Sequence, residues 1–509
     1  MTWRDRAAHV ARGPVAALLL GAATVLGFAP FYLHLVPPIA LAGLVILLLS
    51  SASAHRSAWL GLSFGIALFG AGVSWIYVSL HDFGGMPMPL AIIAMVLLCT
   101  FLALFPSAVG WVQKMSRVSP AVAAIVLIPA LWVIADWVRS WIFTGFPWLA
   151  LGYSQVPYSP LSGFMPLLGV YGVSGLVAMS GGLLGLAVFA RDWRWLLALA
   201  ALWGVGYALQ QVHWTSPAGA PLEVSLLQGN ITQDRKFQEG ELERTMALYR
   251  AMTLRSSSRL IIQPESSLPI LRRQTPEGYL QELANHARRN SGDVLIGMFF
   301  EGAPEQYFNT MFSFGTAPEQ QYRKHHLVPF GEFIPLRPLF GQLIEEILHI
   351  PMSDQSRGPA RQEPLAVAGQ QVAVNICYED VFGEELIVQL PKATLLVNVS
   401  NDAWFGRSIG PQQHLQISQA RALESGRYML RATNTGVTAF IDERGHVLSR
   451  SEEFVTTALD GTAQGFSGAT PYVRWGNAAA LSLAFGSIAA ALASGWRRQR
   501  WDAQRRYSD

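Results

Sequence analysis

A buried β-strand that ends at a cysteine is predicted by the run Val372-Ala373-Val374-Asn375-Ile376-Cys377-Tyr378-Glu379-Asp380. Apolar and small residues lead up to Cys377, and acidic residues follow it closely. The chain has 2 cysteines, and a thiol at the mouth of a strand beside carboxylates is a candidate nucleophile. The other cysteine, Cys99, lies in a long apolar run, where we expect a small packing residue.

The region from Thr215 to Arg474 around this strand holds most of the acids and has no long apolar run. Short apolar, β-branched runs recur in it, and amphipathic helical patterns lie between several of them. Alternating strands and helices predict an α/β layered domain whose strands are buried on both faces. The expected strands are Leu222–Leu227, Leu260–Gln263, Val294–Phe300, Val372–Cys377, Leu395–Val399 and Val437–Ile441. The expected helices are Glu241–Leu254, Pro276–Asn290 and Gln412–Arg431, and a hairpin turn is expected at Glu443–Gly445.

The rest of the chain has the composition of a membrane protein. The sequence is 51% hydrophobic and 14% charged, whereas soluble proteins carry about 25% charged residues. A spanning helix needs about 20 mostly apolar residues. We therefore expect a polytopic α-helical membrane domain of about eight transmembrane helices, at about 13–29, 37–53, 57–80, 89–112, 119–139, 164–189, 194–211 and 476–495.

The orientation of these helices follows from the Lys and Arg residues of the short loops, which mark the cytoplasmic side. They concentrate in the loops that are inside if the N-terminus is inside, and in the basic tail. This distribution predicts helices 1–7 in residues 1–212, an outer domain in 213–474, and helix 8 with a cytoplasmic tail in 475–509. The basic start also resembles a signal peptide, but Ala29-Pro30 is a poor cleavage context, so we expect a retained helix. The loops account for the net charge of +3, and nothing predicts nucleic-acid binding.

Two further strand-end segments each present one reactive group. Gln263-Pro264-Glu265 offers a carboxylate, and Tyr322-Arg323-Lys324 offers an amine. The spacings between Glu265, Lys324 and Cys377 suit separate strands, and we expect the three residues to meet at one sheet edge. His325 and His326 follow Lys324, but adjacent histidines lack the usual spacing of zinc ligands, so packing or hydrogen bonding is expected and no metal or other cofactor.

The ordered Glu, Lys and Cys resemble the nitrilase superfamily, and nearly the whole chain resembles its membrane-embedded branch, the apolipoprotein N-acyltransferases. In the family's pattern a Trp often stands where this chain has Phe237. The other blocks that carry the resemblance are Phe64-Gly65, Trp75-Ile76-Tyr77-Val78-Ser79-Leu80-His81-Asp82-Phe83-Gly84-Gly85, Gly145-Phe146-Pro147-Trp148-Leu149-Ala150-Leu151-Gly152-Tyr153-Ser154-Gln155, Ser400-Asn401-Asp402-Ala403-Trp404-Phe405-Gly406 and Arg431-Ala432-Thr433-Asn434-Thr435-Gly436.

The resemblance implies an αββα sandwich and a role for each site residue. Cys377 would be the nucleophile, Glu265 its base, and Lys324 the oxyanion partner together with a backbone N–H near Cys377. Supporting roles fall to Glu332, Tyr378 and Glu379, and candidate substrate contacts to Phe237, Trp148 and Tyr153.

The resemblance also implies the substrates and the place of the reaction. A membrane phospholipid would acylate Cys377, and the resulting thioester would acylate the N-terminal amine of a diacylglyceryl-cysteine apolipoprotein. The enzyme would be a monomer in the bacterial inner membrane, with its catalytic domain on the periplasmic side.

Two other functions stay open from the residues alone. A membrane-tethered nitrilase-like amidase would use water as the acceptor, and a transporter or receptor would use the outer domain only to bind ligand. The apolar segment Phe330–Met352 fits either a peripheral helix that caps the core or a lid or membrane-dipping arm beside the active site.

Overall fold

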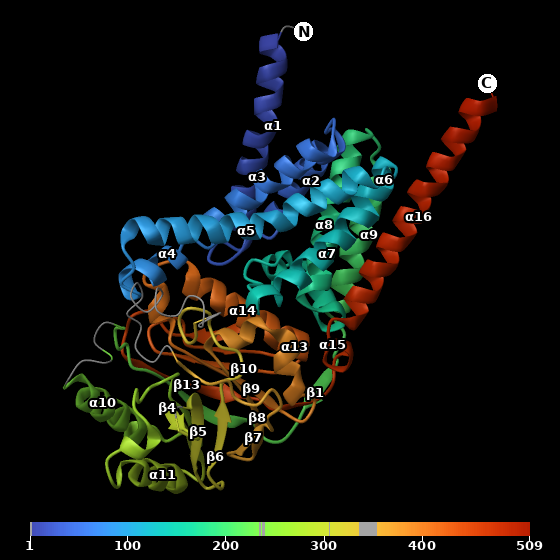
Figure 1. Cartoon of the computed structure of the whole chain (residues 1–509). Helices are drawn as coiled ribbons and strands as arrows, with labels where there is room; N and C mark the ends of the chain where they lie inside the picture. The colour runs from blue at the N-terminus through green and yellow to red at the C-terminus, as the bar shows by residue number, and fades with distance from the viewer. Residues whose placement is uncertain (1–2, 234–235, 237–239, 305, 335–353, 509) are drawn as a thin grey trace. The chain divides into compact units, whose positions relative to one another are not determined.

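The computed structural model describes residues 3–233, 236, 240–304, 306–334 and 354–508 (Figure 1). The chain divides into two units. The helical unit contains Met1–Ser74, Ile92–Val212 and Trp475–Asp509, and the α/β unit contains Trp75–Ala91 and His213–Arg474.

Helices occupy every region in which the sequence predicts a span. By length and composition, 4 of the described helices can cross a membrane, and a fifth can if a bent pair counts as one span. Three further apolar helical segments are shorter, so the number eight remains a prediction. The helices are α1 (Trp3–Thr24), α2 (Val36–Leu49), α3 (Ala54–Gly72), α5 (Met88–Met115), α7 (Ile128–Arg139), α8 (Met165–Phe189), α9 (Arg194–Leu209) and α16 (Ala478–Ser508).

The span expected at about 57–80 is broken in the structure. Helix α3 ends at Gly72, and the next helical segment, Ile76–Phe83, is bent from it by 58°. The backbone leaves helical geometry at Val73, whose φ is −126° and ψ 20°. Beyond this break the chain belongs to the α/β unit. The continuous apolar run in the sequence is therefore divided between the two units.

Residues Trp75–Ala91, which we call the arm, pack on the α/β unit through aromatic and polar contacts. The Trp75 indole N–H donates to Gln413 Oε1 at 3.2 Å, and its ring meets Phe405 edge-on with centroids 4.5 Å apart. The Ser79 hydroxyl donates to the backbone carbonyl of Trp404 at 2.7 Å. The arm is thereby fixed to the loop that follows one of the central strands.

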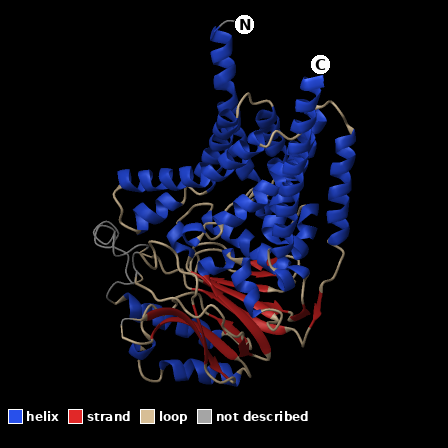
Figure 2. Cartoon of the chain, turned by 45° about the vertical axis from the view of Figure 1, so that its right-hand side comes forward, coloured by secondary structure: helices blue, strands red, loops and turns tan. Residues whose placement is uncertain are grey.

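The α/β unit contains two 6-stranded sheets (Figure 2). In each sheet three neighbouring strands run parallel, and the strands beside them are antiparallel. One sheet has the order β13-β2-β3-β4-β5-β6, with bounds Thr457–Ala463, Leu222–Gln228, Leu260–Ile262, Asp293–Glu301, Tyr307–Gly315 and Gln320–Arg323. The other has the order β12-β11-β10-β9-β8-β7, with bounds Val447–Arg450, Ala439–Ile441, Met429–Thr433, Leu395–Ser400, Gln370–Ile376 and Leu365–Val367.

The main core lies between the sheets and is formed by side chains of both, such as Leu226, Ile262, Val374 and Val397. Two other apolar clusters cover the outer faces. Helices α10 (Glu241–Arg255) and α11 (Tyr279–Arg289) pack on one sheet, and α14 (Gly410–Ser425) packs on the other (Figure 1). This four-layer αββα arrangement agrees with the sandwich that the resemblance implies.

The strand predictions are confirmed for all six runs, but one helix prediction is too long. Helix α14 ends at Ser425, not at Arg431, because Gly426 has a left-handed φ of +64°. A Cβ on Gly426 would lie 2.8 Å from Thr215, so the chain turns there and enters β10. Of the segment Phe330–Met352, residues from 335 onward lie outside the described residues.

Candidate active site

Glu265, Lys324 and Cys377 lie together, but the prediction of one sheet edge is wrong, because their strands belong to both sheets. Glu265 follows β3, Lys324 follows β6, and Cys377 follows β8 directly. Lys324 Nζ lies 3.3 Å from Glu265 Oε1, and the charges of both residues act on the Cys377 thiol. The fold therefore brings together three groups that are widely separated in the sequence.

The Glu265 carboxylate is buried and fixed at both oxygens. Asn309 Nδ2 donates to Oε1 at 2.7 Å, and the backbone N–H of Asn401 donates to Oε2 at 2.9 Å. Asn309 lies on β5, whereas Asn401 follows β9, so the two sheets hold the carboxylate between them. Such fixation orients a base before it reacts.

Lys324 is a permanent cation of the site. Its Nζ donates to Glu332 Oε1 at 2.6 Å as well as to Glu265. Burial by itself would lower the pKa of Lys324, but Glu265 and Glu332 together raise that pKa above its usual range. Burial raises the pKa of Glu332, against the opposing pull of Lys324. Lys324 is thus suited to stabilise negative charge and not to exchange protons.

The Cys377 thiol is partly buried and protonated at rest. Burial, followed by the charge of Glu265, raises its pKa well above the usual range, and Lys324 only partly offsets this. The residue has a left-handed φ of +54°, a strained conformation for a residue with a Cβ. Asn398 Nδ2 donates to its carbonyl oxygen at 3.1 Å and so helps to hold this turn. A base must therefore remove the proton as the thiol attacks.

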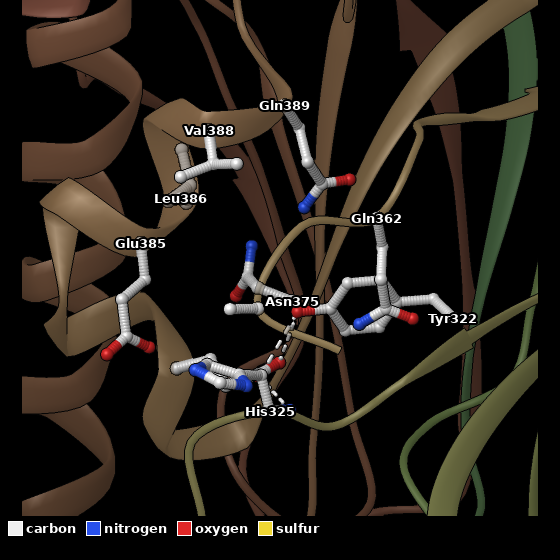
Figure 3. Close-up of a pocket in the computed structure, with 10 residues that line it drawn as sticks. Tyr322, His325, Gln362, Asn375, Glu385, Leu386, Val388 and Gln389 are labelled. Atoms are coloured by element: carbon white, nitrogen blue, oxygen red, sulfur yellow. Dashed lines mark hydrogen bonds between the residues drawn. The ribbon is translucent and has the colours of Figure 1, made fainter. Parts of the chain in front are cut away.

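Glu379 joins the nucleophile segment to the lysine segment. The backbone N–H groups of Ile376 and His325 donate to its carboxylate, each at 2.7 Å, and the Tyr322 hydroxyl donates at 3.1 Å. Burial raises the pKa of Glu379 to about 7, against these hydrogen bonds. Figure 3 shows two of the contacts beside a small pocket that Glu379 helps to line. This position agrees with the supporting role expected from the sequence.

Replacing Glu379 by Gln should lower both stability and rate. The amide offers one acceptor oxygen where the carboxylate offers two, so a buried N–H loses its partner at a cost of about 1–3 kcal/mol. We expect a lower melting temperature of the purified protein and a lower kcat. Glu277→Gln, at an exposed position, is the matched control. A Glu379→Gln protein that melts and turns over like this control would contradict the bracing role.

A buried ionic cluster supports the other side of Cys377. His414 Nε2 lies 2.9 Å from Asp380 Oδ1 and 3.3 Å from the Cys377 carbonyl oxygen. Its Nδ1 lies 2.9 Å from Asp402 Oδ1, and Arg431 Nη2 donates to Asp402 Oδ2 at 2.8 Å. Burial and Arg431 oppose protonation, but the two aspartates raise the pKa of His414 to about 9. The cluster therefore holds charge at rest and fixes the backbone of the nucleophile.

Other residues singled out from the sequence have structural contacts. Tyr378 packs edge-on against Phe382, and the His326 ring stacks on Phe382 with centroids 3.6 Å apart. Trp148 and Tyr153 belong to the helical unit, where both are buried. Phe237 lies outside the described residues.

Sequence reasoning missed several residues that hold the site. Asn309 has no motif signal, because β5 was not predicted. Asp402 and Arg431 lie in quoted blocks and could have been inferred as partners of opposite charge. Lys236 stands beside Phe237 in the sequence, and its burial became visible only in the fold.

Comparison with known proteins gives matches to both the helical unit and the α/β unit. The family described as "Apolipoprotein N-acyltransferase N-terminal domain" matches residues 20–183, and the carbon-nitrogen hydrolase family matches residues 223–465. The apolipoprotein N-acyltransferase of Nitrosomonas europaea is 57% identical over 94% of this chain and 96% of its own length. Those of Chromobacterium violaceum and Methylococcus capsulatus are 42% and 43% identical, over 95% and 93% of this chain and 94% of their own lengths.

One of the two units has a nitrilase-type αββα fold, and the relatives match this chain over nearly its full length. The chain therefore belongs to the apolipoprotein N-acyltransferase family and is an acyltransferase of lipoprotein biosynthesis.

Proposed function

We propose that this enzyme transfers an acyl chain from a membrane phospholipid, through a thioester on Cys377, to the α-amine of a diacylglyceryl-cysteine apolipoprotein. The observation that carries the proposal is the meeting of a neutral thiol with a fixed carboxylate and a permanent cation. These are the base, nucleophile and oxyanion partner that acyl transfer requires.

In the first half-reaction Cys377 Sγ attacks the ester carbonyl carbon of the phospholipid while Glu265 takes the thiol proton. Lys324 stabilises the oxyanion of the tetrahedral intermediate. The C–O bond then breaks, and the proton on Glu265 passes to the departing glycerol oxygen. A lysophospholipid leaves, and the acyl chain remains as a thioester.

In the second half-reaction the neutral α-amine of the lipoprotein attacks the thioester carbonyl. Glu265 takes a proton from the attacking nitrogen and returns it to the sulfur as the C–S bond breaks. The products are an amide-linked third acyl chain and the free thiol. Both half-reactions use the same oxyanion position, which is why one fixed lysine serves both.

We further propose that the enzyme works as a monomer in the bacterial inner membrane, with the α/β unit on the periplasmic side. The excess of Lys and Arg in alternate short loops supports this orientation. Substrates that are anchored in lipid can then reach a membrane-bound enzyme by lateral diffusion, without extraction into water.

A test of the proposed function separates the two half-reactions. Purified protein is given phospholipid alone, and intact mass is measured before and after a diacylated lipopeptide is added. We expect an acyl mass that hydroxylamine removes, and its transfer to the peptide amine. Release of free fatty acid with no gain of mass on the peptide would instead identify a hydrolase, the role of the carbon-nitrogen hydrolase family by name.

Replacing Lys324 by Met should lower kcat about 10²–10³-fold, the usual loss when an oxyanion donor is removed. The change also leaves Glu265 and Glu332 without their shared cation, so the melting temperature should fall. Acyl-enzyme formation and thermal unfolding measure the two effects. The exposed Lys392→Met is the control, and a Lys324→Met protein with unchanged kcat would remove the lysine from the mechanism.

A further inference from the structure

A second lysine, Lys236, lies near Glu265 and Cys377 and has no role in the mechanism above. Only 5% of its surface is exposed, and its charge interacts with both Glu265 and Cys377. Among the described residues, no hydrogen bond or ion pair joins its ammonium to a carboxylate. A lysine buried to this degree is rare unless it has a partner.

The chain around Lys236 is tied to the site by a run of amide contacts. The Lys236 backbone N–H donates to the Thr232 carbonyl oxygen at 3.1 Å. The neighbouring Gln233 accepts from Asn401 Nδ2 at 2.9 Å, and the Asn401 backbone N–H in turn donates to Glu265. These bonds join the Lys236 backbone to Thr232, and the neighbouring Gln233 to the loop residue that donates to Glu265.

Glu265 does not serve as the missing partner. Its two oxygens accept from Asn309, Lys324 and Asn401, and no hydrogen bond or ion pair to Lys236 is among the contacts of the described residues. Lys236 acts on Glu265 through its charge. Within the described part of the chain, the Lys236 ammonium thus has no carboxylate partner and can bind a ligand. An anion is the ligand that such a group binds best.

The two substrates of the proposed function differ in the charge they bring. The acceptor brings an amine, which a neighbouring cation repels when it is protonated. The donor brings a phosphodiester, which glycerophospholipids with an alcohol headgroup, such as phosphatidylethanolamine, carry a few bonds from their ester carbonyls. The anion that fits Lys236 therefore belongs to the donor.

We propose that Lys236 binds the phosphodiester of the phospholipid donor and so positions its ester carbonyl at Cys377. This rests on the proposed function, because it assumes a phospholipid donor. Lys236 is then a specificity residue of the first half-reaction: it favours donors with a phosphate over esters of the same chain length without one.

The pH dependence of donor choice follows from the same arrangement. Burial lowers the pKa of Lys236 to about 8, with Glu265 and Cys377 opposing. The lysine is thus mostly protonated at pH 7 and mostly neutral at pH 9. Phosphodiester binding needs the charged form, so the preference for phospholipid should fall as the pH rises through about 8. Glu265 and Cys377 act on every ester donor, so a ratio of two donors isolates the lysine.

The test compares two donors on full-length purified protein: phosphatidylethanolamine, and p-nitrophenyl palmitate, which has no phosphate. Acyl-enzyme formation is followed by intact mass in a single turnover. We expect Lys236→Met to lower the ratio of the phospholipid rate to the aryl ester rate about 10- to 100-fold. Lys236→Arg should restore most of the ratio, and the exposed Lys392→Met should leave it unchanged.

Three results would overturn the proposal. An unchanged ratio in Lys236→Met, or an equal loss with both donors, would show that the lysine does not recognise phosphate. A loss confined to transfer from the acyl-enzyme to the lipopeptide would assign it to the acceptor. Failure of the proposed function is distinguishable: the unaltered protein would then take an acyl chain from the aryl ester but none from phospholipid.

Discussion

A Cys377→Ser protein is expected to keep its fold and to lose acyl transfer at least about 10⁴-fold, because the nucleophile acts as one unit with its base and oxyanion partner. The thioester cannot form on an oxygen, so the acyl mass that hydroxylamine removes should disappear. The serine hydroxyl is also a far weaker nucleophile than the thiol beside a carboxylate base. Intact mass after exposure to phospholipid measures the result directly.

Cys99→Ser is the matched control for this experiment, since it removes the only other thiol of the chain. We expect it to become acylated like the unaltered protein. Equal acylation of Cys377→Ser and the unaltered protein would place the acyl chain on another residue, and the thioester mechanism would then fail.

A Glu265→Gln protein should lose about 10²–10⁴-fold in kcat, the range that general base catalysis contributes. The amide oxygen can still accept from one of its two donors, Asn309 or Asn401, but the amide cannot take the proton of a thiol whose pKa is raised by burial. Acyl-enzyme formation should therefore slow while phospholipid binding changes little. Single-turnover kinetics separate these two effects.

Glu332→Gln is the sharpest comparison for Glu265→Gln, because both carboxylates contact Lys324. We expect a loss at least about tenfold smaller for Glu332, since only Glu265 is among the charges that act on Cys377. A larger loss for Glu332→Gln would reverse the assignment of the base.

The sequence predicted strands correctly where a run of apolar residues in the sequence is also buried in the structure. Apart from β10, the parallel strands of both sheets are apolar runs, and the sequence predicts each of them. Strand β10 (Met429–Thr433) was not predicted, because the expected helix covered its first residues. The failures have physical causes. The helix ending at Ser425 was extended to Arg431 because periodicity does not register the left-handed turn at Gly426. Strand β5 was missed because its run Tyr307–Gly315 mixes polar and aromatic residues.

The site could be predicted only in part for a related reason. Cys377, Glu265 and Lys324 are reactive groups at strand ends, so their chemistry is visible in the sequence. Asn309 fixes the base from an unpredicted strand, and the charge cluster around His414 depends on pairing between distant segments. Such partners become identifiable only when the sheets bring them together.

The arm has a consequence for how the α/β unit can be cut out of the chain. Its residues, Trp75–Ala91, are separated in sequence from His213–Arg474 by more than a hundred residues of the helical unit. A fragment that begins at His213 would lack them, and Trp404 and Phe405 would lose their aromatic cover next to Asp402. The unit that holds the chemistry is thus a discontinuous domain, and a soluble version of it would need the arm restored as a grafted or added peptide.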